Sequence, residues 1–130
     1  MADRISLGGL PVGEQEPLIS TAVRFGNLLF LSGRAAVDPT TLQVTSDDFE
    51  QQARFVLDEI VGVLRSAGSG PEHVLRVECY LADAADFRAW NRLFAEYFPP
   101  PRPARTTLVT GFAVPGLRIE VQVTAGIPGA

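Results

Sequence analysis

The strict alternation of residues 117–125 is the feature that most constrains what this chain can fold into. One face of the expected strand carries Ile119, Val121, Val123 and Ala125, and the other carries Arg118, Glu120, Gln122 and Thr124. A period of two is typical of a half-buried β-strand, and residues 75–81 alternate in the same way. Because the apolar side of each strand must be covered, the pattern predicts a sheet with another layer packed on one face.

Two other stretches repeat apolar residues at intervals of three and four, which is the period of an amphipathic helix. The first runs from Phe49 to Ala67, with a capping-box pattern at Thr45 and Asp48 in front of it and Gly68 as its stop. The second begins after Asp83 and ends at three consecutive prolines, because proline cannot continue a helix. It carries four aromatic residues on one side: Phe87, Trp90, Phe94 and Tyr97. Such a stripe is typical of core packing more often than of a ligand platform.

The remaining signals complete an α/β domain. Residues 21–25 and 28–31 flank Gly26-Asn27 and predict a hairpin, and residues 106–110 read as a further strand. Two helices can cover only one face of such a mixed sheet, so the face bearing Glu120 must meet water or another subunit. We expect residues 1–130 to form one domain, with residues 1–17 and 127–130 as loose termini.

Composition excludes several classes of chemistry. All 11 basic residues are arginine, so Schiff-base chemistry and a Walker-type phosphate loop are excluded. A single histidine, His73, and a single cysteine, Cys79, leave no set of ligands for a usual transition-metal site, and we expect no metal and no cofactor. We expect Cys79 to be a buried core thiol and His73 a solvated turn residue.

Charge and hydropathy bear on partners and location. The net charge of −4 makes nucleic acid an unfavourable partner, and no apolar run is long enough to cross a membrane. The first residues lack the basic start and apolar stretch of a signal peptide, so we expect a cytoplasmic protein that has no contact with membranes.

Two residues stand out as candidates for chemistry. Arg105 follows a rigid proline-rich turn in Pro103-Ala104-Arg105, and its planar guanidinium can bind a carboxylate through two charge-assisted hydrogen bonds. Glu120 lies on the polar face of the last strand. Each residue taken alone is more often a solvated surface group or a salt-bridge partner.

Four separate stretches stand out by their order and spacing along the chain. They are Ala22–Gly33 ending in Ser-Gly, Asp48–Ala53 with Ala67-Gly68-Ser69, Tyr80–Phe87 with Asn91, and Pro103-Ala104-Arg105 with Ile119-Glu120. No single piece is specific, whereas their order and spacing are. Over residues 19–125 the chain thereby resembles the Rid family of reactive intermediate imine deaminases, also called YjgF proteins.

The resemblance implies a chorismate-mutase-like α/β fold, a homotrimer with clefts between subunits, and hydrolysis of reactive imines and enamines to 2-keto acids and ammonia. Arg105 matches the arginine that holds the substrate carboxylate, and Glu120 matches the acid that positions or activates the attacking water. Ser32 and Gly33 match the edge of the pocket, and Asn91 matches a helix residue near the site. The implied partners are a small carboxylate-bearing substrate and further copies of the chain.

Three positions depart from the family pattern. Ile19 stands where many imine deaminases have a pocket tyrosine, which predicts a more apolar pocket. Gln122 replaces a second glutamate, which removes a negative charge near Glu120 and predicts a lower pKa for Glu120 than a paired acid would have. Arg34 replaces a frequent glutamine. These changes bear on substrate choice more than on the fold.

The departures keep other functions open. Arg34 could favour a dicarboxylate such as an aminomuconate-like compound, although a solvated arginine is the commoner case. A non-catalytic trimer that uses Arg105 to bind a carboxylate metabolite is a second hypothesis. Ribonuclease activity is a third, and the acidic charge balance argues against it.

Overall fold

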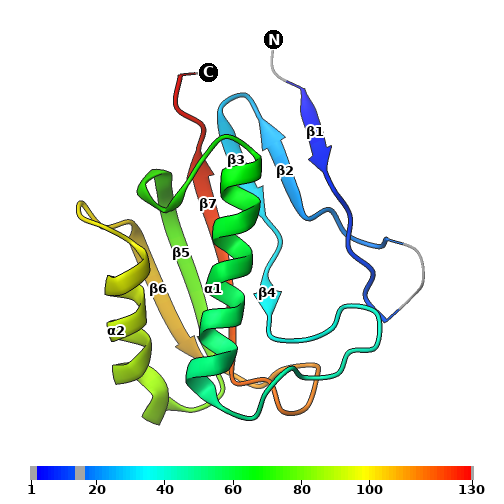
Figure 1. Ribbon diagram of the computed structural model, residues 1–130, viewed down its shortest axis with the longest axis vertical. Coiled ribbons are helices and arrows are strands. Elements are labelled where there is room, and N and C mark those ends of the chain that lie inside the picture. Colours follow the sequence, from blue (N-terminus) through cyan, green and yellow to red (C-terminus); the bar gives the residue numbers. More distant parts are fainter. Residues whose placement is uncertain (1–2, 14–16, 130) are drawn as a thin grey trace.

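A computed structural model describes residues 3–13 and 17–129 and consists of one mixed sheet with two helices on one face (Figure 1). Among these residues the sheet has seven strands. They are β1 (Arg4–Leu7), β2 (Ala22–Phe25), β3 (Leu28–Leu31), β4 (Arg34–Ala35), β5 (Val74–Leu81), β6 (Ala104–Val109) and β7 (Ile119–Gly126). The helices are α1 (Phe49–Ser66) and α2 (Phe87–Tyr97), and two short 3-10 turns, Pro71–His73 and Ala84–Asp86, precede β5 and α2. The predicted mixed sheet with two helices on one face is confirmed.

The strand order is β1-β2-β3-β7-β5-β6, and β4 pairs with β7 beyond the end of β3. All neighbours are antiparallel except β5 and β6, which are parallel and joined by α2. β7 lies in the middle of the sheet, and each of its odd-numbered residues from 119 to 125 is buried, while the even-numbered residues are partly exposed. The alternation in the sequence therefore marks the helix-covered face and the open face.

The first helix begins one turn after the predicted capping residue. The side chain of Asp48 accepts a hydrogen bond from the backbone N–H of Gln51 at 2.9 Å, so Asp48 is the N-cap. The prediction that Thr45 and Asp48 together form a capping box was wrong, because Thr45 lies outside the helix and its N–H donates to Ala36. Gly68 follows the helix with a φ of +85°, and the predicted stop at this glycine is confirmed.

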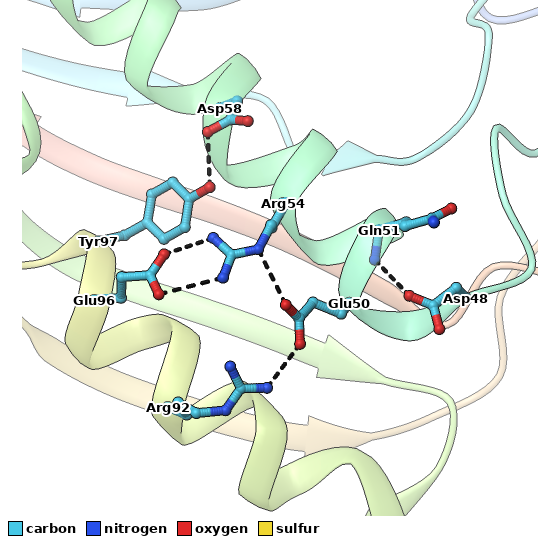
Figure 2. A network of polar contacts seen from close by, with 8 residues as sticks. All are labelled: Asp48, Glu50, Gln51, Arg54, Asp58, Arg92, Glu96 and Tyr97. Atoms are coloured by element: carbon cyan, nitrogen blue, oxygen red, sulfur yellow. Dashed lines mark hydrogen bonds and ion pairs between the residues drawn. The ribbon is translucent and has the colours of Figure 1, made fainter.

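An exposed network of charged side chains joins the two helices (Figure 2). Arg54 of α1 reaches Glu50 on its own helix and Glu96 on α2, while Arg92 of α2 reaches back to Glu50 at 2.7 Å. These arginines hold the pKa of Glu50 and of Glu96 below the usual range through hydrogen bonds and charge. The network fixes how α2 lies beside α1 over the sheet.

The prediction of a loose N-terminus was wrong within the described residues, because Arg4–Leu7 forms β1 and pairs antiparallel with β2. The short strand β4 was also not predicted. Its two residues carry too little pattern to read, and β4 is defined by its pairing with β7. At the other end, the backbone N–H of Ile127 donates to Asn27 and its side chain is buried, so ordered structure extends one residue past β7.

The single cysteine lies in the core. Cys79 is 1% exposed, and burial raises the pKa of its thiol, so the predicted core thiol is confirmed. His73 is partly exposed in the turn before β5.

Neither α1 nor α2 has the combination of length and hydropathy required to span a bilayer, and the described residues contain no other helix that does.

Candidate active site

Glu120 lies at the edge of a cavity of about 220 Å³ on the open side of the sheet. The cavity lies between the segment before β2, the loop after β4 and the loop before β7, and most of the residues that line it are apolar. They include Leu10, Val12, Ile19, Leu42, Phe112 and Val114, while Arg34 and Glu120 are the charged members of the lining. Glu120 is paired across the sheet with Tyr80 on one side and Ala35 on the other, which fixes the direction of its side chain.

The Glu120 carboxylate rests against the backbone of Gly33. A Cβ atom placed on Gly33 would lie 2.6 Å from Oε2 of Glu120, closer than any such contact in a real structure. Glycine is therefore required here for the carboxylate to occupy its position. Gly33 lines the cavity next to Glu120, and its predicted contact with substrate stays a prediction.

The electrostatic environment of Glu120 follows from the apolar walls. Among residues 3–13 and 17–129, no hydrogen bond or ion pair to this carboxylate is present. Burial raises the pKa of Glu120 above its usual value because the charged form loses hydration. Gln122 donates instead to Glu78 at 3.2 Å, so the amide that replaces a second acid is tied to a different carboxylate.

Ser32 lies between the end of β3 and Gly33, and it ties this part of the chain to the segment that leads into β2. Its hydroxyl donates to the carbonyl oxygen of Ser20 at 2.6 Å, and its N–H donates to Thr21. These bonds fix the backbone that leads from Ile19 into β2. Direct contact between Ser32 and substrate stays a prediction.

Arg105 projects from the opposite face of the same sheet. Its register partner on β5 is Val77, which in turn faces Val123 on β7, and both valines are buried under the helices. Glu120 lies three residues from Val123 and so points to the other side. One chain therefore does not bring Arg105 and Glu120 into one cleft, although the sequence singled out both.

The guanidinium of Arg105 lies over an aromatic shelf on α2. Its central carbon is 4.8 Å from the ring centre of Phe94 and within 6 Å of the rings of Phe87 and Trp90. The indole N–H of Trp90 donates to Thr107 at 3.2 Å, which fixes the shelf against β6. No carboxylate in the described part of the chain pairs with Arg105. The arginine is held in place by cation–π contacts and is left without a counter-ion.

Asn91 belongs to the same helix. Its Oδ1 is buried and lacks a hydrogen-bond partner among the described residues, which is a costly state for an amide oxygen. Asn91 lies one turn after Phe87, on the helix against which Arg105 packs. The aromatic stripe, expected mainly as core packing, is thus both core and the support of the candidate carboxylate-binding arginine.

Arg34 is one of the residues that line the cavity, but its guanidinium is not a free cation. The guanidinium lies 3.3 Å from Glu59 of α1. The register partner of Arg34, Val121, faces the helices, so the Arg34 side chain leaves β4 on the side opposite to Glu120. This ion pair disfavours the hypothesis that Arg34 binds the second carboxylate of a dicarboxylate substrate.

Sequence reasoning missed Gln52, which holds the loop before β7 in place. Its buried amide donates to the carbonyl oxygens of Ser46 and Gly116 and accepts from the N–H of Arg118 at 2.9 Å. A buried glutamine on the apolar side of a helix was the available signal, because such a residue needs hydrogen-bond partners.

No group of three or more potential metal-ligating side chains occurs in the part of the chain that the structure describes.

Comparison with known proteins identifies the relatives of this chain. The model of the family described as Endoribonuclease L-PSP matches residues 15–127. The chain is 34% identical over 120 residues to 3-aminoacrylate deaminase RutC from Acinetobacter baylyi, covering 91% of this chain and 95% of that protein. It is 35% identical over 106 residues to the chloroplastic Reactive Intermediate Deaminase A of Arabidopsis thaliana, covering 82% of this chain and 57% of that protein.

Solved structures also share the fold of this chain. A crystal structure of a Rid-family protein of unknown function from Yersinia pestis superposes with a TM-score of 0.83 at 25% identity, covering 96% of this chain and all of that one. Together with the family model and the two deaminases, this match shows that this chain belongs to the Rid (YjgF) family.

Proposed function

We propose that this protein hydrolyses reactive 2-imino acids and their enamine forms to 2-keto acids and ammonia. The observation that carries the proposal is a pair of oppositely charged groups that lack ionic partners among residues 3–13 and 17–129: the partly buried carboxylate of Glu120 and the guanidinium of Arg105. Relatives named as a reactive intermediate deaminase and a 3-aminoacrylate deaminase support the same chemistry.

The reaction requires a held carboxylate and an activated water. Arg105 binds the substrate carboxylate, which places the adjacent C=N carbon in a fixed position. Glu120 takes a proton from water as the water oxygen bonds to that carbon, the C=N electron pair moves to nitrogen, and Glu120 passes the proton on to that nitrogen. In the resulting carbinolamine, Glu120 takes the hydroxyl proton and delivers it to nitrogen as the C=O bond forms, the C–N bond breaks and ammonia leaves. A raised pKa suits Glu120 to this exchange, because a general base works best with a pKa near the operating pH.

The two groups act together only if different subunits contribute them. We therefore propose a homotrimer in which Glu120 of one chain faces Arg105 of the partner subunit. The open face of the sheet supports an interface, because it exposes large apolar side chains that a solvated surface would not favour. They are Phe25 at 51%, Phe30 at 45% and Leu108 at 53% exposure.

The first test follows imine hydrolysis in competition with semicarbazide. An amino-acid oxidase generates the imine, and the protein diverts it from the semicarbazone. We expect Arg105→Ala to lose at least about 10²-fold in kcat/KM and Arg105→Lys to recover only part of it, because lysine keeps the charge but not the two parallel bonds. No acceleration over buffer by the wild-type protein would refute the proposed activity.

A second test asks whether the site lies between subunits. We expect Arg105→Ala and Glu120→Gln chains each to be nearly inactive alone, and co-expressed mixtures to regain activity. In a cyclic trimer assembled at random from equal amounts, roughly a quarter of the interfaces would combine an intact Glu120 with an intact Arg105. A mixture as inactive as its components, at a trimeric mass, would place the site within one chain.

The description of the matching family model favours one further candidate, an endoribonuclease. The net charge of −4 and the carboxylate at the cavity both oppose a phosphate backbone. We expect RNA to stay intact with purified protein. A non-catalytic carboxylate-binding trimer would instead bind keto acids without any turnover of imines.

A further inference from the structure

The cavity beside Glu120 is lined mostly by apolar residues, with Glu120 and Arg34 as its charged members. Its volume of about 220 Å³ is below the roughly 300–1,000 Å³ of sites that hold a whole drug-sized ligand, so it suits one side chain of a small metabolite. Ile19 forms part of the wall at the position expected to carry a hydroxyl in related deaminases. Phe112 and Val114 close the opposite side from the loop before β7.

Leu42, one of the residues that line the cavity, has an unfavourable backbone conformation. Leu42 has a φ of +60°, in the left-handed region that glycine or asparagine adopts far more readily than leucine. The turn that holds it is fixed by Asp38, whose carboxylate accepts from the N–H groups of Thr40 and Thr41 at 2.9 Å and whose carbonyl accepts from Leu42. Strained residues of this kind persist where the surroundings hold them and often line functional sites. Here the result is one more apolar side chain on the cavity wall.

We infer that this cavity receives the side chain of the imino acid, and that the protein acts on imines of branched and aromatic apolar amino acids in preference to the imine of alanine. The inference rests on the proposed function. With the carboxylate held by Arg105 of the partner subunit and the C=N carbon beside Glu120, the third substituent of that carbon extends into the apolar cavity. Acidic side chains are rejected there, because Glu120 repels them and Arg34 is paired with Glu59.

The expected preference follows from the surface removed from water. Each methylene buried in an apolar site contributes a factor of about four to binding. The leucine-derived imine carries three more carbons than the alanine-derived one. We therefore expect kcat/KM, each corrected for hydrolysis in buffer, to differ on the order of 50-fold in favour of leucine.

The experiment compares imines generated from alanine, leucine, phenylalanine and aspartate in the semicarbazide assay. We expect leucine and phenylalanine to exceed alanine, and aspartate to be slowest. Ile19→Phe fills the cavity and should lower the leucine-to-alanine ratio at least about 10-fold. Ile5→Phe is the matched control, since Ile5 is 49% exposed against 39% for Ile19 and lies on β1 outside the cavity. It should leave the ratio unchanged.

The outcomes separate this inference from the proposed function. Two results overturn the inference and leave the proposed function standing. One is turnover of every imine with a leucine-to-alanine ratio of kcat/KM near one. The other is a ratio that Ile19→Phe does not change. No turnover of any imine overturns the function. Calorimetry then decides the inference: tighter binding of the keto acid of leucine than of pyruvate, lost in Ile19→Phe, supports the apolar subsite, and equal or absent binding overturns it.

Discussion

Substituting Gly33 by alanine should disable the site through a single added carbon. The new Cβ would lie 2.6 Å from Oε2 of Glu120, whereas ordinary contact begins near 3.4 Å. The carboxylate must therefore move by about 0.8 Å, and a displacement near 1 Å can cost about 10²-fold in rate. Gly33 does not have a positive φ, so alanine fits the backbone and the fold should be retained. We expect kcat/KM to fall by about 10- to 100-fold.

The assay is imine hydrolysis alongside thermal unfolding. Gly62→Ala serves as the control, because its Cβ would meet open space on α1 and alanine there should stabilise the helix by about 0.5–1 kcal/mol. Gly33→Ala should add little to the loss already caused by Glu120→Gln if it acts through the carboxylate. Full activity in Gly33→Ala, or the same fold-loss in the Glu120→Gln background, would refute this reasoning.

Three further substitutions test the electrostatics and packing around the site. Burial raises the pKa of Glu120, so its favourable contribution to stability is present below the unfolded-state pKa and is lost as pH rises through the folded-state pKa. Glu120→Gln should therefore gain Tm relative to wild type as the pH rises from the unfolded-state pKa of a glutamate through the folded-state pKa of Glu120, and a constant difference would contradict the assignment. Arg92 and Arg54 lower the pKa of Glu50, and Arg54 lowers the pKa of Glu96, which stabilises the fold above the unfolded-state pKa of these groups. Arg54→Met should accordingly make urea unfolding less sensitive to acidification from about pH 5 to pH 3, and an unchanged pH profile would count against the network. Gln52→Ala leaves three backbone groups without partners and should cost about 2–4 kcal/mol, a Tm loss of roughly 10 °C that scanning calorimetry would detect or exclude.

Local patterns predicted most of the elements because each pattern has one physical cause. Alternation placed β5 and β7, the three-and-four stripe placed α1, and the run of prolines placed the end of α2. The capping residue was assigned one turn too early because Thr45 and Asp48 both carry oxygens that can cap a helix. β1 was missed since a four-residue edge strand in a glycine-rich opening has too little pattern to read.

The sequence by itself determined which residue types could carry chemistry here. A chain without lysine and with one histidine leaves arginine and carboxylates as the available charged groups, and the contexts of Arg105 and Glu120 marked these two. It also placed Glu120 on the polar face of its strand, because side chains alternate along a strand.

Only the tertiary structure decided how those residues relate in space. The register between β5, β6 and β7 sets Arg105 and Glu120 on opposite faces of one sheet, and register depends on pairing between segments far apart in the chain. The close contact between Gly33 and Glu120, the three hydrogen bonds of Gln52 and the apolar cavity likewise arise from segments that meet only in the folded state. Local periodicity carries no information about such distant contacts, and for that reason the site became visible only when the sheet was assembled.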